Sequence, residues 1–334
     1  MKVLVCGDFS FEFYEPDFCW ALREAGAEVV ELPVSKYFTP LRAAQTKLVF
    51  GPGVALANAA LVLACARSRP DAVLLWRTPW AAPLSLWLSR AAGAGKIALY
   101  NNDDPFGPDR DRRIWRAFRP LIPHADLCLA YRSLNLDEYR AAGARRVALL
   151  RSGFHPHRHR PLPVAPEADV VFAGHAEDDE RLDAVDALAR SSLNVRLHGS
   201  GWERLLRGRP GARYLPVRPV LGDGYVRAIA SAKVALAFLS RRNRDQYTRR
   251  CFEIPAIGTL MLAPRTGELL QLFREDQEAA FFSSPAELVA QALRFCTDEP
   301  LRARVAAAGH ARVVAGGHDL VSRARELLRQ LEAA

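Results

Sequence analysis

The residues of this chain best suited to chemistry gather in one short segment that a glycine closes. Two acids, Asp245 and Glu253, lie eight positions apart, and two adjacent cations, Arg249 and Arg250, lie between them. The segment follows the apolar run 234–240, so it should form the loop and helix start after a strand. Backbone N–H groups at a helix N-terminus and guanidinium groups suit a diphosphate, whereas a carboxylate suits a ribose or sugar hydroxyl pair. The segment therefore predicts a site for a nucleotide-diphosphate sugar.

Helical spacing gives this segment a defined geometry. Glu253 lies four positions after Arg249 and three after Arg250, so one helix face would hold a carboxylate beside a guanidinium. Pro255 has no backbone N–H and belongs in the first turn or at a kink, which sets the helix start close by. Asp245 would lie in the preceding loop, within reach of the same ligand. The alternative interpretation is a surface ion pair without a ligand.

A second polar segment follows the apolar run 97–100. Asp103 and Asp104 come after two asparagines, at the carboxyl end of the expected strand, where open sheets bind ligands. Either acid could act as a general base or bind hydroxyl groups. The segment is equally consistent with an ordinary turn and helix cap, and spacing does not choose between the two acids.

The elements that position these residues alternate along the whole chain. Strand-like apolar runs lack polar alternation and are separated by helical patterns, which indicates parallel sheets covered on both faces. The chain is also longer than one core usually grows. We therefore expect an α/β protein with two doubly wound domains. The expected strands are 2–6, 28–33, 72–76, 97–100, 127–131, 147–150, 170–173, 195–198, 214–217, 234–239, 260–263 and 279–282.

The expected domain boundary lies in a segment rich in proline. Residues 151–166 hold four prolines and three histidines with no apolar period, which is typical of a linker. We expect an N-terminal domain over 1–152, a linker over 153–166 and a C-terminal domain over 167–334. Ser284 and Glu287 form a capping box after the last expected strand, so the chain should end in a helical tail.

Composition narrows the classes of partner and location. Lys and Arg number 46 against 37 Asp and Glu, but no run of five basic residues occurs, so a nucleic-acid partner is not expected. Six cysteines without a C-x-x-C pair indicate a reduced, cytoplasmic protein. The single glycine at Gly7 does not support a dinucleotide cofactor.

One apolar stretch allows two interpretations. It belongs either to a buried core or to a surface in peripheral contact with the inner face of the membrane. Its residues are Trp80, Leu84, Leu86, Trp87 and Leu88, beside Arg77 and Arg90.

Four segments together resemble a known family. Residues 248–273 carry an F-E-x-P-A-x-G core, and 282–289, 102–106 and 139–147 accompany it. They are similar to the CgeB-like (spore-maturation type) glycosyltransferases. The resemblance implies the GT-B fold: two Rossmann-like domains facing a central cleft, with the donor on the second domain and the acceptor on the first.

The resemblance also implies roles for particular residues. In related GT-B transferases a Glu-x7-Glu pair handles the donor: Glu253 matches the second acid, which binds the ribose, and Asp245, a shorter acid, stands in the first position. No metal or cofactor is implied, because helix dipole and basic side chains neutralise the leaving diphosphate. Candidates for that charge are Arg249, Arg250 and Arg181. The donor rim would include Gly174, His175, Gly201, Trp202, Thr266, Gly267 and Glu268, and the acceptor would lie near Asp8, Arg77 and either Asp103 or Asp104.

These observations predict a metal-independent cytoplasmic glycosyltransferase. The acceptor class (glycan, lipid-linked glycan, small molecule or protein), the donor base and sugar, and a retaining or inverting outcome stay open. A nucleotide-sugar epimerase of the same fold and a non-catalytic sugar-nucleotide-binding protein are the alternatives. We expect Glu253→Ala to lose donor binding while the fold survives.

Overall fold

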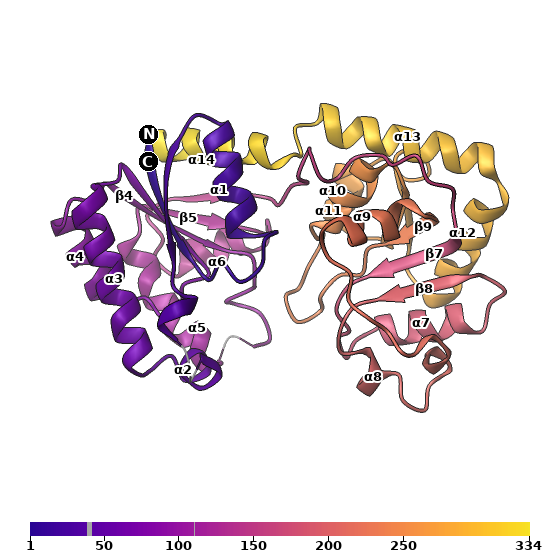
Figure 1. Ribbon diagram of the computed structural model, residues 1–334, viewed down its shortest axis with the longest axis horizontal. Coiled ribbons are helices and arrows are strands. Elements are labelled where there is room, and N and C mark those ends of the chain that lie inside the picture. Colours follow the sequence, from indigo (N-terminus) through magenta and orange to yellow (C-terminus); the bar gives the residue numbers. More distant parts are fainter. Residues whose placement is uncertain (39–41, 110) are drawn as a thin grey trace. The chain divides into compact units, whose positions relative to one another are not determined.

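The computed structural model describes residues 1–38, 42–109 and 111–334, without the side chains of residues 42, 43 and 46. The described chain forms two compact units. The first unit comprises Met1–Arg151 together with Leu320–Ala334, and the second comprises Ser152–Asp319 (Figure 1).

The first unit is built on a six-stranded parallel sheet. Its strand order is β2-β1-β3-β4-β5-β6. The central strands are buried along nearly their whole length, which explains why they read as continuous apolar runs. The strand bounds are β1 (Lys2–Gly7), β2 (Glu28–Pro33), β3 (Ala72–Trp76), β4 (Lys96–Asn101), β5 (Leu127–Ala130) and β6 (Val147–Leu149).

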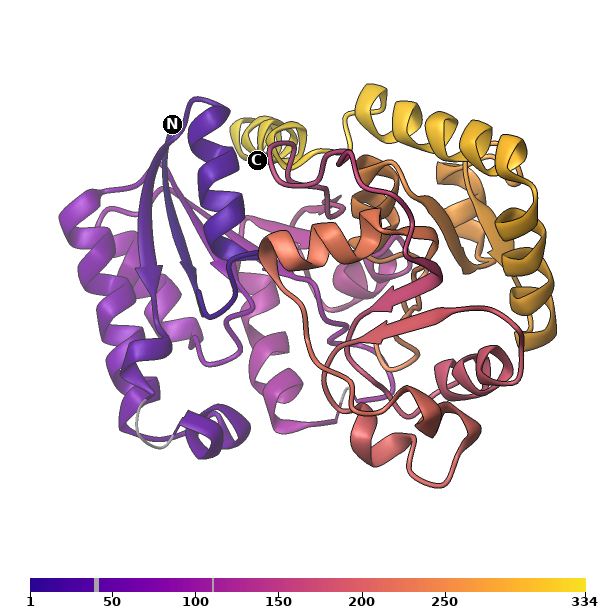
Figure 2. The ribbon, with the colours of Figure 1, turned by 45° about the vertical axis from the view of Figure 1, so that its right-hand side comes forward.

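Helices cover both faces of this sheet. Alternate strand residues such as Leu4 and Cys6 pack in a core with Leu61 of α3 and Leu86 of α4. On the other side, α14 packs along α1, as the yellow and indigo helices of Figure 2 show. The helices are α1 (Glu15–Glu24), η1 (Ser35–Tyr37), α2 (Arg42–Leu48), α3 (Pro52–Ser68), α4 (Pro83–Ala91), α5 (Arg113–Phe118), η2 (Arg119–His124), α6 (Asn135–Ala141) and α14 (Leu320–Ala333).

The last helix therefore lies in the first unit, whereas the sequence placed residues 167–334 in one C-terminal domain. Helix α14 buries Ala324, Leu327 and Leu331. Lys96 also donates to the carbonyl of Leu331 at 2.9 Å. These contacts connect positions more than 200 residues apart, so no local pattern could reveal them.

The second unit is built on a five-stranded parallel sheet of order β11-β10-β9-β7-β8. Its strands are β7 (Ala168–Ala173), β8 (Val195–His198), β9 (Ala232–Leu236), β10 (Leu260–Pro264) and β11 (Ala280–Phe282). Its helices are α7 (Arg181–Ala189), α8 (Trp202–Leu205), η3 (Pro210–Tyr214), α9 (Gly222–Ala230), α10 (Arg250–Ile257), α11 (Gly267–Leu272), α12 (Pro285–Thr297) and α13 (Glu299–Ala315).

Two expectations for this unit differ from the structure. The strand expected at 214–217 does not form, and Tyr214 instead ends the short helix η3. Pro216 cannot donate to a strand ladder, which disfavours that strand. The expected linker 153–166 belongs to this unit: Phe154 forms a bridge with Asp319, and both Phe154 and His159 are buried.

Each sheet has a point at which the strand order reverses. In the first unit it lies between β1 and β3, and in the second between β7 and β9. Loops from neighbouring parallel strands diverge there and leave room for a ligand at the carboxyl edge. Asp8 and Arg77 follow β1 and β3, and Gly174 follows β7, so the fold brings candidate residues to both points.

Candidate functional site

In the second unit, Arg250 is held at the point where the strand order reverses. Its Nε donates to the carbonyl of Ala173, the last residue of β7, at 2.7 Å. The guanidinium lies over the Phe172 ring, 5.6 Å from its centroid. Among the described residues no carboxylate forms an ion pair with Arg250. The cation therefore has a fixed position at the carboxyl edge without an acidic partner.

Glycines make this position accessible. A Cβ on Gly174 would stand 2.5 Å from Phe172 Cζ and 2.8 Å from Arg250 Nη2, so glycine leaves room for the guanidinium over the Phe172 ring. Gly199 has a φ of +140°, and a Cβ there would overlap the Gly174 carbonyl. Two close backbone approaches therefore shape the loops after β7 and β8.

Buried Glu253 forms a polar cluster with the half-buried residues Arg249 and Tyr225. Arg249 Nε lies 2.6 Å from Glu253 Oε1, and the Tyr225 hydroxyl donates to Glu253 Oε2 at 2.8 Å. Burial raises the pKa of Glu253, but the Arg249 guanidinium, His159 and the Tyr225 hydroxyl together lower it below its usual value. Burial lowers the pKa of the nearby His159 to about 4 and outweighs the effect of Glu253. At neutral pH Glu253 is thus charged and His159 neutral.

The position of Glu253 bears on its expected role. The residue is only 1 % exposed, and both carboxylate oxygens have partners inside the protein. In this structure the carboxylate positions Arg249 and Tyr225, and a ribose could reach it only by displacing one of them.

The loop after β9 and the start of α11 are joined through Thr266. Its hydroxyl donates to the Gln246 carbonyl and accepts the Leu269 N–H as the cap of α11. Asp245 closes the same loop by exchanging hydrogen bonds with the backbone of Ser240. No other atom lies within 4 Å of the position that a Cβ on Gly267 would take, whereas Glu268 is buried.

Two expected donor residues, Arg181 and Trp202, have structural partners instead. Arg181 is buried, and its nitrogens donate to Asp179 and to the carbonyls of His175 and Leu239, so it ties two loops together rather than offering charge. Trp202 is fully buried and donates to the Gly174 carbonyl at 3.0 Å. It is a core residue, not a rim residue. Gly201, with a φ of +86°, allows the turn into α8.

His175 is exposed. Its Nδ1 lies 2.9 Å from Ser200 Oγ. It stands directly after Gly174, so the structure does place it at the carboxyl edge.

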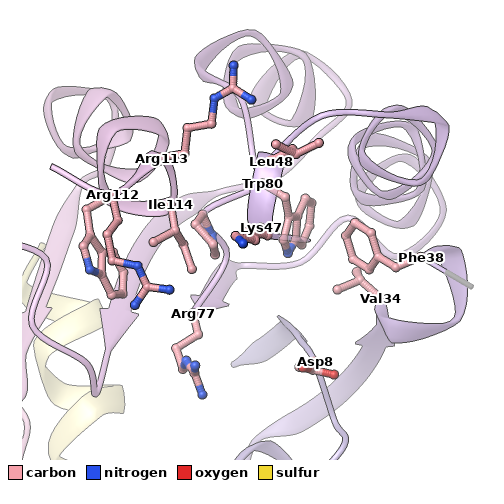
Figure 3. Close-up of a pocket in the computed structure, with 12 residues that line it drawn as sticks. Asp8, Val34, Phe38, Lys47, Leu48, Arg77, Trp80, Arg112, Arg113 and Ile114 are labelled. Carbon is pink, nitrogen blue, oxygen red and sulfur yellow. The ribbon is translucent and has the colours of Figure 1, made fainter. Parts of the chain in front are cut away.

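The first unit has a cavity of about 640 Å³ at its own reversal point (Figure 3). Asp8 and Arg77, from the loops after β1 and β3, both line it. Arg77 is held by Asp103, with Nη2 2.9 Å from Oδ2. Burial lowers the pKa of Arg77. The carboxylates of Asp103, Glu15 and Asp8 and the Tyr14 hydroxyl raise it by more, so the net pKa lies above its usual value. Its charge is therefore firmly held.

The structure separates the two acids that spacing left equivalent. Asp103 faces Arg77, whereas Asp104 is buried and accepts from the Phe106 N–H and from Asn135 Nδ2, each at 3.0 Å. Asp104 thus stabilises the turn after β4. Asp103 contacts a residue that lines the cavity.

Sequence reasoning missed a third acid here. Glu15, at the start of α1, is buried beneath Gly7 and accepts the Asp8 N–H at 3.0 Å. Burial raises its pKa despite the hydrogen bonds and the nearby Arg77. An acid at a helix start is so common that the sequence carried no signal for this role.

The cavity lining was largely unforeseen as well. It includes the cations Lys47, Arg112 and Arg113, from elements distant in sequence from Asp8 and Arg77. The apolar residues expected at 80–88 do not all lie in the same environment. Trp80 and Leu86 are buried, and Trp80 lines the cavity. Leu84, Trp87 and Leu88 are exposed.

Within residues 1–38, 42–109 and 111–334, no three His, Cys, Asp or Glu side chains converge as metal ligands would. In the same part of the chain, no helix has the length and apolarity needed to cross a bilayer.

Comparison with known proteins identifies relatives of the fold. Residues 181–329 match the family model described as glycosyl transferase-like. The sucrose-phosphate synthase of Thermosynechococcus elongatus superposes with a TM-score of 0.73 at 14 % identity, covering 99 % of both chains. HepE of Anabaena, in complex with UDP-glucose, gives a TM-score of 0.68 at 13 % identity over 100 % of both chains. A glycosyltransferase from Rickettsia africae gives 0.68 at 13 % identity, covering 99 % of this chain and 98 % of its own.

No curated protein sequence matches the chain significantly. The expected two-domain fold is nonetheless confirmed by these structures. The chain carries a glycosyltransferase-like family match over residues 181–329, and over its whole length it has the GT-B fold of glycosyltransferases.

Proposed function

We propose that this protein transfers a sugar from a nucleotide-diphosphate sugar to an acceptor hydroxyl, with the donor on the second unit and the acceptor on the first. The observation that carries the proposal is the position of Arg250 beside Gly174 at the carboxyl edge of β7. A guanidinium without an acidic partner, next to glycine backbone, suits the leaving diphosphate. The UDP-glucose complex of HepE, which shares the fold, makes UDP-sugars the first donors to test.

The reaction balances without an added reagent. An acceptor oxygen forms a bond to the anomeric carbon, and the bond from that carbon to the diphosphate oxygen breaks, so the nucleoside diphosphate leaves with the electron pair. The acceptor proton must pass to a base. We assign this role to Asp8, which lines the cavity of the first unit, and we assign to Asp103 the positioning of Arg77.

Metal independence is part of the proposal. Arg250 supplies a fixed positive charge at the carboxyl edge of β7. This guanidinium can stabilise a departing diphosphate as a metal ion does in other transferases.

Calorimetry with UDP and UDP-glucose tests the donor site. Arg250→Met keeps the aliphatic stem and removes the charge, so affinity should fall by roughly tenfold or more, because a hydrogen bond to a charged group contributes about 1.5–3 kcal/mol. Arg241→Met is the matched control, since Arg241 is exposed and pairs with Glu180 on the surface. Equal affinities in both variants would remove Arg250 from the donor site.

Product analysis separates the alternatives. An epimerase would convert the donor sugar without any acceptor, and a non-catalytic binding protein would bind nucleotide without turnover across a broad acceptor panel. A transferase forms product only with an acceptor, apart from slow donor hydrolysis.

We further infer peripheral contact with an anionic membrane through α3 and α4. Leu84 is 65 % and Trp87 63 % exposed, and Leu56 and Leu63 of α3 are also exposed. Arg90 and Arg145 line a hollow together with Trp87, which places cations beside the apolar side chains. Apolar residues flanked by basic ones suit a surface of anionic lipids.

Co-sedimentation with vesicles tests this contact. Binding to phosphatidylcholine–phosphatidylglycerol vesicles should exceed binding to phosphatidylcholine alone, and it should fall in Leu84→Ser/Trp87→Ser. Equal binding of the variant and the wild type would place any membrane contact elsewhere.

A further inference from the structure

The cavity of the first unit has two chemically different ends. Figure 3 shows Asp8 and Arg77 on one side and Arg113 on the opposite side, with Lys47 between them and the guanidinium of Arg112 on the side of Arg77. Asp8 is the acidic residue among the described lining, whereas the other four charged residues are cations. A ligand that fits both ends needs a hydroxyl at one and negative charge at the other.

The cations differ in how firmly they are already paired. Arg77 is held by Asp103 at 2.9 Å. Arg112 contacts Asp109 at 3.3 Å in an exposed pair, and such pairs contribute only about 0–1 kcal/mol, so a ligand can displace it. Among the described residues no carboxylate pairs with Lys47 or Arg113. The end of the cavity away from Asp8 therefore carries positive charge that the protein does not neutralise.

Apolar residues connect the two ends. Val34, Phe38, Trp80 and Trp115 line the cavity and are almost fully buried. Fixed aromatic side chains suit the apolar face of a sugar ring or a similar cyclic polyol.

From this arrangement we propose that the acceptor is a phosphate ester that also carries a free hydroxyl, such as a sugar phosphate or a phosphorylated polyol. The phosphate binds Lys47, Arg112 and Arg113, the ring packs on the aromatic residues, and the hydroxyl faces Asp8. A phosphate is favoured over a carboxylate because its charge of about −1.5 to −2 and three oxygens suit a cavity lined by several cations. The inference rests on the proposed function and names the acceptor class for it.

Binding measurements test the phosphate requirement without turnover. Pairs of ligands that differ only in the phosphate, glucose against glucose 6-phosphate and inositol against inositol phosphate, are titrated by calorimetry. The phosphorylated member should bind at least roughly tenfold more tightly, and added salt should reduce the difference.

Charge-removing variants locate the site. Lys47→Met and Arg113→Met should each lose roughly tenfold in affinity for glucose 6-phosphate and leave UDP affinity unchanged. Arg67→Met is the matched control, because Arg67 is an exposed cation of α3 in the same unit and does not line the cavity. Equal loss in all three variants, or equal binding of both members of a ligand pair, would overturn the proposal.

Two further measurements distinguish a lipid-borne phosphate from a soluble one, and failure of this inference from failure of the proposed transferase function. Phosphatidylinositol 4-phosphate vesicles compete with glucose 6-phosphate if a lipid headgroup enters the cavity, whereas phosphatidylcholine vesicles do not. Competition thus identifies a lipid-borne phosphate ester, and its absence identifies a soluble one. UDP binding without Lys47-dependent binding of glucose 6-phosphate would contradict only this inference. Binding of glucose 6-phosphate without any donor binding would contradict the proposed transferase function.

Discussion

Removing the buried carboxylate of Glu253 should destabilise the second unit. The carboxylate lies 2.6 Å from Arg249 Nε and accepts the Tyr225 hydroxyl at 2.8 Å. Breaking a buried ion pair by removing one partner costs about 3–5 kcal/mol. The Arg249 side chain is 21 % exposed and can turn toward water, so Glu253→Ala should cost about 3 kcal/mol, the lower end of that range.

A conservative variant and a control sharpen the expectation. Glu253→Gln keeps the volume and one acceptor but loses the charge, so it should cost about 1–2 kcal/mol. Glu180→Ala is the control, because Glu180 forms an exposed pair with Arg241 worth about 0–1 kcal/mol. For a unit of this size about 3 kcal/mol lowers Tm by roughly 6–12 °C. The fold is therefore expected to survive Glu253→Ala with a lower Tm.

Hydrogen exchange with peptide resolution is the suitable assay, because a chain of two units need not unfold in one transition. Amides of α9 and α10 should lose protection in the order wild type, Glu253→Gln, Glu253→Ala, while peptides of the first unit stay unchanged. Titration with UDP and with inorganic diphosphate then separates the roles of Glu253. If Glu253 binds the ribose, Glu253→Ala should lose affinity for UDP but keep its affinity for inorganic diphosphate. Wild-type protection of α10 in Glu253→Ala would refute the electrostatic reasoning.

Three further predictions concern the same unit. Because burial lowers the folded-state pKa of His159 from 6.5 to about 4, the unfolded chain takes up the proton first, and stability should fall by up to about 3 kcal/mol as pH drops from 6.5 toward 4. Urea titrations should show a shallower loss in His159→Gln, and parallel curves would contradict the assignment. Gly174→Ala would place a methyl group 2.8 Å from Arg250 Nη2, so calorimetry should show UDP affinity falling about tenfold, and unchanged affinity would argue against this placement of the donor. Dialysis against EDTA should leave the transfer rate unchanged, whereas loss of activity restored by Mg²⁺ would end the metal-independent mechanism.

Patterns that extend over one element were sufficient to predict most of the fold. The apolar runs at 2–6, 72–76 and 97–100 are buried strands because a parallel sheet covered on both faces excludes polar alternation. Pairing of elements far apart in the chain was not accessible in this way. Helix α14 is amphipathic wherever it packs, so its own sequence could not reveal that it joins the first unit.

The sequence alone determined which residue types stand at the ends of the strands, and hence that Asp8, Arg77, Gly174 and Arg250 gather at carboxyl edges. Only the tertiary structure decided what each can do there. Burial and partners are properties of the whole fold: they enclose Glu253 and engage every nitrogen of Arg181, yet leave Arg250 without a carboxylate partner among the described residues. They also bring Lys47 and Arg113 to the cavity of Asp8, because packing joins side chains that no spacing along the chain relates.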